Sequence, residues 1–398
     1  MLLYGAVAAE SPHYVATEDA GGSLLVIDRG ISDRHARMLE VEPRKHDHIL
    51  HLTRGDRGQP WRVRRFADGF ESISAMLGHG GKVHVISGPT YQVLADDNGD
   101  GVADRRSIVS SIEPPPIETI HHSMKDLSVL HALLVDRARS NQMRIEAMWI
   151  IRRLTIPTDA ADQTASSEKP TDPTPWFITA LHNGPDELRA EAARVLRVAP
   201  EQSKPAIKGL IHRAKNDRNA KVRLEAAITL GHLRAIDGVA ELFGSLDDAD
   251  DAARFAKIMA IRAINEWDFA PAFINAADPR IREGAMLALL DIRNESAIDA
   301  LAFALRSSPY VEMRLAAIKA LERSRLQTVA IPTTDRPATW TIQHFRVSAE
   351  SSLTCQEALR SAIHDDDEEV ANLAAKMRDW IAHQAYENTE RKALGVSD

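Results

Sequence analysis

An arginine recurs at nearly regular intervals through the last two thirds of the chain, each time near the start of an alanine-rich segment with helical spacing. A second apolar segment with helical spacing precedes each of them. The intervals are 45, 34, 31, 28 and 32 residues, between Arg144, Arg189, Arg223, Arg254, Arg282 and Arg314. Because a single helix pair cannot bury both of its apolar faces, successive pairs must stack and share a core. The spacing therefore predicts a curved α-solenoid with two solvent faces.

The first 115 residues have a different composition. Thirteen of the 20 glycines lie in residues 1–101, among short runs rich in β-branched and aromatic residues. These runs predict strands of an antiparallel meander, enough for one or two propeller blades: 13–16, 23–28, 62–66, 82–86 and 91–94. The prolines 114–116 then interrupt the chain, since proline suits neither a helix interior nor a sheet ladder. We predict a β-rich module over 1–115 and a proline linker over 116–123.

We predict the solenoid over 124–385, with two interruptions. Polar sequence at about 155–175 and the segment 328–350, which contains Pro332 and Pro337, are interpreted as insertions. A seventh helix pair is expected over 352–384, and the charged end at 386–398 is expected to fray. The predicted fold class is therefore mainly α, a solenoid in the form of an armadillo-like superhelix, with a small N-terminal β-rich module.

Charge and cysteine content exclude several classes of protein. The formal charge is −8, which argues against nucleic acid as the partner. No segment approaches the roughly 20 continuous apolar residues of a membrane span. Residues 1–9 resemble the core of an export signal but lack its basic start. The single cysteine, Cys355, can form neither an internal disulfide nor the CxxCH attachment of a haem, and we expect it to be a structural thiol in a helix.

The best local motif is an acidic, glycine-containing loop over residues 96–104. Oxygen ligands at positions one, three, five, seven and nine are typical of a Ca²⁺ loop, and here they are Asp96, Asn98, Asp100, the backbone carbonyl of Val102, and Asp104. Position twelve is Ser107 instead of glutamate, and strand-like runs flank the loop, which favours a constitutive structural ion over a sensing one. The alternative is an acidic hairpin loop that satisfies itself through Asx turns.

Other polar clusters have simpler explanations. His46, His48 and His51 are spaced for one strand, and a solvated polar strand is favoured over a transition-metal site because no partner ligand has a known spacing. The six repeat arginines could form an anion-binding ladder, but we favour a bracing role, in which they pair with carboxylates of neighbouring turns such as Asp217 and Asp278. The acidic run 365–369 suits a helix start. The chain contains no phosphate-binding loop and no GxSxG motif.

The arginine-led second helices and Asp-marked turns resemble HEAT repeats over about 124–384. More narrowly, Ala260-Ile-Arg-Ala-Ile-Asn-Glu266, preceded by the loop that starts at Tyr91 and by Phe66-Ala-Asp-Gly69, resembles the PVC-type membrane-bound dehydrogenases of planctomycetes and verrucomicrobia. That resemblance implies a six-bladed sugar dehydrogenase propeller, HEAT repeats and often a haem domain. Here about 115 residues precede the helices and the haem cysteines are absent. HEAT enzymes of the deoxyhypusine hydroxylase type carry His-Glu dipeptides, and this chain has none.

These observations lead to two expectations about function. The first is a non-catalytic HEAT-repeat scaffold, in which the concave, second-helix face binds a protein partner and the β module, with its calcium loop, caps the N-terminal end. The alternative is a divergent or truncated quinoprotein-type sugar dehydrogenase subunit of the glucose/sorbosone kind, or a fragment of such a protein. The resemblance implies a periplasmic location, and a cytoplasmic one stays open. No haem is expected in either case.

Overall fold

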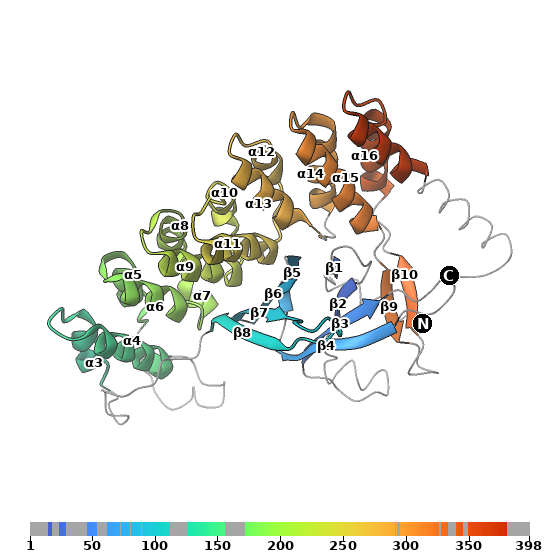
Figure 1. Ribbon diagram of the computed structural model, residues 1–398. Helices are drawn as coiled ribbons and strands as arrows, with labels where there is room; N and C mark the ends of the chain where they lie inside the picture. Colours follow the sequence, from blue (N-terminus) through green and yellow to red (C-terminus); the bar gives the residue numbers. More distant parts are fainter. Residues whose placement is uncertain are drawn as a thin grey trace.

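The computed structural model describes residues 15–17, 24–28, 46–53, 62–71, 73–79, 81–88, 90–111, 126–155, 172–290, 292, 295–325, 328–332, 340–344 and 349–379. The predicted linker at 116–123 and the tail at 386–398 lie outside these ranges, as does most of the insertion at 155–175. Within them, paired helices form a curved row and two small sheets lie beneath its inner side (Figure 1).

The helices alternate between an outer and an inner row of the solenoid, as the arginine spacing predicts. The first, outer helices are α3 (Leu127–Val135), α5 (Thr174–Asn183), α8 (Ile207–Asn216), α10 (Val239–Phe243), α12 (Ala270–Ile274), α14 (Glu295–Ser307) and α16 (Ala349–Ala362). The second, inner helices are α4 (Asn141–Thr155), α6 (Asp186–Val195), α9 (Ala220–His232), α11 (Asp251–Ile264), α13 (Pro279–Leu289) and α15 (Val311–Arg325). Residues 368–379 form the last inner helix, and α7 (Pro200–Ser203) is a short turn after α6. The prediction of an α-solenoid is confirmed.

Small residues let the inner helices pack closely against one another. Ala226, Ala227 and Ala260 have no exposed surface. A Cβ atom added to Gly231 of α9 would lie 2.8 Å from the Cα atom of Ala260 in α11, so these two helices are nearly in backbone contact. Packing at this density leaves little room for larger side chains. The alanine-rich second helices of the sequence therefore form the continuous spine of the solenoid.

The repeat arginines brace one repeat against the next. The distance from Nη2 of Arg189 to Oδ1 of Asp217 is 2.7 Å, and four further arginines make the same kind of pair with the following repeat: Arg223 with Asp248, Arg254 with Glu283, Arg282 with Glu312 and Arg314 with Asp365. Arg144 instead donates to the carbonyl of Leu134. The bracing role is confirmed for Asp217 but wrong for Asp278, whose carboxylate caps α13 by accepting from the backbone N–H of Arg280.

The N-terminal part forms two antiparallel meanders of four strands each. One sheet contains β1 (Val15–Thr17), β2 (Leu24–Asp28), β3 (Asp47–Thr53) and β4 (Arg62–Phe70), and the other contains β5 (Ile73–His79), β6 (Lys82–Ser87), β7 (Thr90–Ala95) and β8 (Arg105–Ser110). This confirms a small β module, although β5 and β8 are absent from the predicted strands. A further hairpin, β9 (Thr328–Pro332) with β10 (Trp340–His344), falls in the predicted insertion 328–350.

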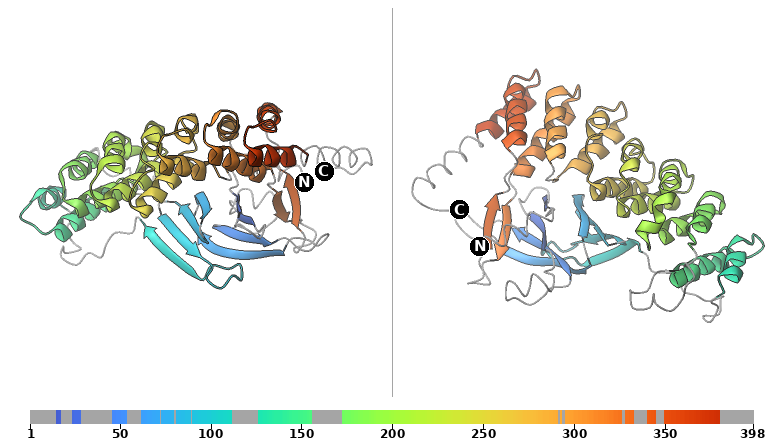
Figure 2. Two further views of the ribbon diagram at one scale, coloured as in Figure 1. Left: turned by 45° about the horizontal axis from the view of Figure 1, so that its top comes forward. Right: turned by 180° about the vertical axis from the view of Figure 1, so that it is seen from behind.

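The β module does not cap the N-terminal end of the solenoid, so that expectation is wrong. The sheets lie along the inner row of helices in all three views, with β5 and β6 beside α11 and the end of β8 near α6 and α9 (Figures 1 and 2). The physical reason is that the inner helices carry side chains, described below, that bond to and stack on the second sheet. Local sequence patterns do not report contacts of this range.

Candidate functional site on the inner face of the solenoid

Strands β5 and β6 are held against α11 by stacked rings and by one buried arginine. The ring of His84 in β6 stacks on the ring of Phe255 in α11, with centroids 4.6 Å apart and planes 5° apart. His79 of β5 packs against the same phenyl ring at 5.4 Å. Nη2 of Arg262, a fully buried side chain of α11, donates to the backbone carbonyl of Met76 at 2.7 Å. These contacts place one edge of the second sheet directly on the middle of the inner face.

The end of β8 is joined to α6 and α9 by a buried polar network. The Ser110 hydroxyl donates to Oε2 of Glu225 at 2.6 Å, and Arg197 bonds both to that hydroxyl, at 2.9 Å, and to the Glu225 carboxylate. Nε of Arg197 also donates to the hydroxyl of Thr229 at 3.0 Å. Buried charges of this kind are tolerated because each is paired and hydrogen-bonded. The network therefore holds the end of β8 against the inner face, so that the β module covers the middle of that face.

Burial of His84 at this junction keeps its ring neutral. Burial, reinforced by the charges of His79 and Lys82, lowers the pKa of His84 to about 4. One ring nitrogen, Nδ1, lies 2.7 Å from the hydroxyl of Tyr91 in β7, and burial raises the pKa of that phenol. A neutral imidazole can share a hydrogen bond with the phenol and stack on Phe255 at the same time. The contact between the sheet and α11 thus depends on the unprotonated form of His84.

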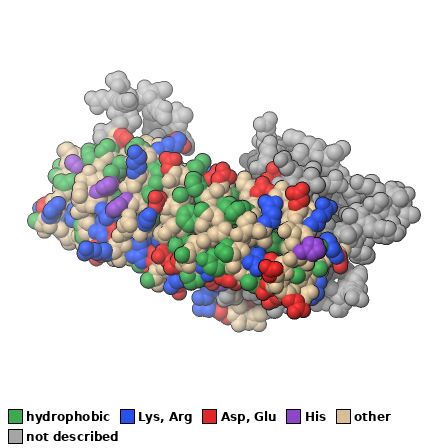
Figure 3. All heavy atoms as spheres, turned by 90° about the horizontal axis from the view of Figure 1, so that it is seen from above, with side chains coloured by type: hydrophobic (Ala, Val, Ile, Leu, Met, Phe, Trp, Pro, Cys, Tyr) green, Lys and Arg blue, Asp and Glu red, His purple; other side chains and the backbone are tan. Residues whose placement is uncertain are grey.

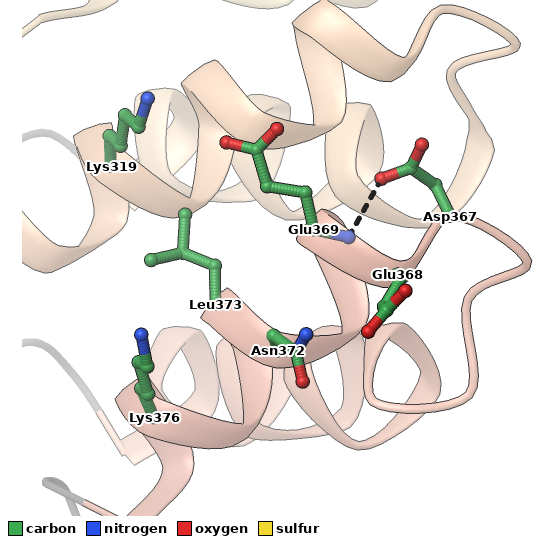
Figure 4. A pocket seen from close by; sticks show the side chains of 7 residues that line it. All are labelled: Lys319, Asp367, Glu368, Glu369, Asn372, Leu373 and Lys376. Atoms are coloured by element: carbon green, nitrogen blue, oxygen red, sulfur yellow. Dashed lines mark hydrogen bonds between the residues drawn. The ribbon is translucent and has the colours of Figure 1, made fainter.

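A groove opens on the inner face at the C-terminal end of the solenoid. It has a volume of about 550 Å³, and its lining comes from α15 and from residues 367–376: Lys319, Asp367, Glu368, Glu369, Asn372, Leu373 and Lys376. Figure 4 shows Lys319, Leu373 and Lys376 on one side of the groove and Asp367 and Glu368 on the other. The two ends of the groove therefore differ in charge. The acidic run was visible in the sequence, but the lysines that face it come from two different repeats.

In the acidic run at 365–369, two aspartates make structural bonds and two glutamates are exposed. Asp365 pairs with Arg314 of the preceding repeat, with 2.9 Å between Nε and Oδ2. Asp367 caps the last inner helix, because its Oδ1 accepts from the backbone N–H groups of Glu369 and Val370 at 3.1 Å each. This confirms the helix-start role. Glu368 and Glu369 remain exposed at the rim of the groove.

The loop over residues 96–104 connects β7 to β8, and its side-chain oxygens accept backbone N–H groups. The Asp96 carboxylate accepts from Gly99 and Gly101, the Asn98 carbonyl from Asp100, and the Asp100 carboxylate from Val102, all at 2.8 Å. The Asp104 carboxylate accepts from the backbone N–H groups of residues 97 and 98 at 2.8 and 3.1 Å. The bonds of Asn98 and Asp100 to the residue two positions on are Asx turns, and the Asp104 bonds close the loop from its other end.

The side-chain oxygens of this loop are the predicted ligands of a cation, and their arrangement shows how they could bind one. A carboxylate oxygen that accepts one N–H group keeps a second lone pair, so the turns leave acceptors for an ion. Among the described residues, however, no three histidine, cysteine, aspartate or glutamate side chains lie close enough together to hold one metal ion. Asp96, Asp100 and Asp104 would therefore have to move towards one another on binding.

Of the three histidines predicted on one strand, His51 lies beside this loop, and His48 pairs with Asp28 of β2 in the ladder. His46 is exposed ahead of β3, whereas His51 is buried and packs against Gly101, where a Cβ atom would lie 2.4 Å from its Nδ1. Asp47, between the two, accepts from the backbone N–H of Ile73 at 2.7 Å and so links β3 to β5. Cys355 in α16 is buried, as expected of a structural thiol.

The outer face of the solenoid carries apolar side chains near its centre (Figure 3). Figure 3 shows this face, where apolar side chains gather over the middle and charged side chains of both signs surround them. Ile236 and Phe269, which precede α10 and α12, keep 57% and 42% of their surface exposed. In the part of the chain that the structure describes, no helix is both long and apolar enough to cross a membrane.

Comparison with known proteins identifies the repeats. The family model for HEAT repeats matches residues 174–262. Solved structures of repeat proteins are similar at low identity: a designed armadillo repeat protein in complex with a peptide (16% identity, 64% of this chain and 100% of that chain, TM-score 0.27), the CpcE and CpcF complex of a Nostoc phycocyanin lyase (19%, 68% and 99%, 0.30) and human deoxyhypusine hydroxylase in complex with glycerol (18%, 64% and 96%, 0.28). No curated protein matches the sequence.

Proposed function

We propose that the chain is a non-catalytic HEAT-repeat scaffold that binds a protein partner on its inner face, at the C-terminal groove. The observation that supports this site is the division of the inner face: the middle repeats contact the β module through Phe255 and Glu225, whereas the groove beside Lys319 is open. A solenoid commonly uses its concave surface for ligands. The groove is a cavity on that surface lined by described residues of two successive repeats.

The lining of the groove indicates the kind of segment it would accept. Lys319 and Lys376 would pair with acidic side chains, and Leu373 between them offers an apolar contact. Glu368 and Glu369 would pair with basic side chains on the opposite side. An extended segment with an acidic end and a basic end therefore complements the groove, and charge complementarity of this kind sets orientation and association rate more than affinity.

Charge reversal tests this site. The full chain is used to capture proteins from the envelope and cytosolic fractions of the native organism, and the affinity of the captured partner is then measured for Lys319→Glu with Lys376→Glu. We expect at least a tenfold loss. The matched control reverses two exposed lysines of the outer helix α8, Lys208→Glu with Lys215→Glu, and should keep the affinity. Loss in the outer variant with retention in the inner one would overturn the proposal.

We also propose, from the ligand spacing, that the loop over 96–104 binds Ca²⁺ as a structural ion. The supporting observation is that side-chain oxygens of Asp96, Asn98 and Asp100 lie at alternate positions of one continuous loop and already accept its backbone N–H groups. Thermal unfolding of the full chain should shift upward in millimolar Ca²⁺, and the shift should vanish in Asp96→Ala with Asp100→Ala. Asp97→Ala is the control, because Asp97 pairs with Arg105 instead. An equal shift in Mg²⁺, or none in Ca²⁺, would remove the site.

The alternative function is a dehydrogenase-type subunit. The observation that favours it is the pair of consecutive four-stranded meanders, each with the strand order of a propeller blade. On this hypothesis, further blades complete the propeller. Addition of a quinone cofactor and a sugar to the isolated full chain tests it directly: cofactor-dependent turnover would favour the alternative over the scaffold.

A further inference from the structure

Arg152, in the last turn of α4, is a buried cation with unused hydrogen-bond donors. Only 1% of its surface is exposed. Nη1 donates to Oε1 of Gln202 in α7 at 2.9 Å, and the guanidinium carbon lies 4.8 Å from the ring centroid of Phe177 in α5. Nε and Nη2 are also buried and have no hydrogen-bond partner in the structure. Of its three nitrogens, only Nη1 therefore donates a hydrogen bond, and its acceptor is the neutral amide of Gln202.

Carboxylates pair with several other arginines that are buried or partly buried, although the fully buried Arg262 donates to backbone carbonyls. Arg189 and Arg223 each meet an aspartate with two hydrogen bonds, and Arg197 meets Glu225. Burial lowers the pKa of Arg152 to about 10, and the charge of Asp172 opposes that shift. The guanidinium is thus still protonated near neutral pH. An uncompensated buried charge is strongly destabilising, so a full positive charge at this position calls for an anion.

Two buried hydroxyl groups on the same elements also lack partners. Thr174 lies one helical turn before Phe177 on the same face of α5, and Ser203 follows Gln202 in α7. Their exposed fractions are 1% and 0%, and neither Oγ1 of Thr174 nor Oγ of Ser203 has a hydrogen-bond partner. The turn after Ser203 packs against α5. The elements that hold Arg152 therefore also carry two unused hydroxyl donors.

Asp172 does not neutralise this charge in the structure. Its carboxylate is on an exposed residue and accepts from the backbone N–H of Thr174 at 2.9 Å. No hydrogen bond joins it to Arg152. It lies close enough to raise the pKa of the guanidinium, so it would compete electrostatically with any other anion that approached.

We propose that Arg152, Thr174 and Ser203 form a binding site for one small tetrahedral oxyanion, phosphate or sulfate, between α4, α5 and α7. The free edge of the guanidinium can donate two charge-assisted hydrogen bonds to such a group, and each hydroxyl can add one. The burial of all three side chains favours a single small ion over an extended ligand. The ion would act as the counter-charge that Arg189, Arg197 and Arg223 receive from carboxylates.

Isothermal titration of the full chain with inorganic phosphate, sulfate, acetate and chloride tests the site. We expect one equivalent of phosphate or sulfate to bind, with acetate and chloride at least tenfold weaker. Arg152→Met should abolish binding, and Arg153→Met, on the exposed neighbouring residue, should leave it unchanged. Asp172→Asn should strengthen binding because it removes a competing negative charge. Equal binding by Arg152→Met, equal response to chloride, or no binding to the wild type would overturn the proposal.

A further double variant keeps the test decisive if Arg152→Met does not fold. Thr174→Val with Ser203→Ala retains the guanidinium and removes both hydroxyls, and it should weaken phosphate binding at least tenfold with no change in fold by circular dichroism. If phosphate binds this double variant as tightly as the wild type, the hydroxyls take no part in a site and the proposal fails.

Discussion

The imidazole ring of His84 in the second sheet lies flat on the phenyl ring of Phe255 in α11, with 4.6 Å between the ring centroids. Together with the bond from Arg262 to the carbonyl of Met76, this contact joins the β module to the middle of the solenoid. The inner face is thereby divided into a part covered by the chain itself and an open groove beside Lys319 and Lys376. If the proposed function holds, this division sets where a partner binds.

The stability of the protein should fall between pH 6.5 and pH 4 because of His84. The pKa of His84 is lowered from 6.5 to about 4 in the folded chain, so in this window the unfolded chain binds more protons at that residue. The neutral His84 ring makes its full contribution to the free energy of unfolding above pH 6.5. As the pH falls from 6.5 to 4, the free energy of unfolding decreases by on the order of 2–3 kcal/mol. Chemical denaturation across this range, compared between wild type and His84→Gln, measures it.

The matched control for this pH dependence is His212→Gln, which changes an exposed histidine of α8. Its stability curve should run parallel to that of the wild type. His84→Gln should give a flatter curve than either. Parallel curves for wild type and His84→Gln would show that His84 titrates alike in the folded and unfolded chains.

Gly101→Ala should destabilise the β module more than Gly99→Ala. Both glycines have positive φ, of 85° and 75°, so each substitution carries backbone strain of roughly 1 kcal/mol. Only at Gly101 would the new Cβ atom also meet a side chain, at 2.4 Å from Nδ1 of His51, whereas nothing lies within 4 Å at Gly99. Thermal unfolding should show the larger loss at Gly101. In a His51→Ala background the two losses should become equal, and a gap that persists there would contradict the contact.

The helical part of this fold was predictable because its signals are local. The arginine at the start of each inner helix and the alanines after it repeat in the sequence, and the ion pair of Arg189 with Asp217 recurs in four further repeats. Strands β5 and β8 were missed for local reasons as well. Residues 73–79 contain a glycine, and β8 begins with two arginines and has five exposed residues, so neither has the alternation of a half-buried strand.

The position of the β module was not predictable, because the contacts that set it are far apart in the chain. Ser110 and Glu225 are separated by 115 residues, and Arg262 and Met76 by 186. The groove was not predictable for the same reason, because Lys319 and Lys376 come from different repeats. Pattern reasoning within one segment cannot identify such neighbours.

Asp248→Ala should destabilise the solenoid by about 3–5 kcal/mol, because it removes the counter-charge of a buried lysine. Oδ2 of Asp248 lies 2.9 Å from Nζ of Lys257, and both side chains are at most 2% exposed, while its Oδ1 meets Arg223 at 2.6 Å. Asp251→Ala is the control, since that side chain is 82% exposed, and it should cost less than about 1 kcal/mol. Urea denaturation distinguishes them. Similar losses in the two variants would contradict a structural role for the buried pair.

A double-mutant cycle between His84 and Phe255 measures whether the β module packs on the inner face of the middle repeats. Unfolding free energies are measured for the wild type, His84→Ala, Phe255→Ala and the double variant. The stacked rings predict a coupling energy of about 0.5–1.5 kcal/mol. Additivity of the two single changes to within about 0.3 kcal/mol would mean that the sheet and α11 are not in contact, and would contradict the account.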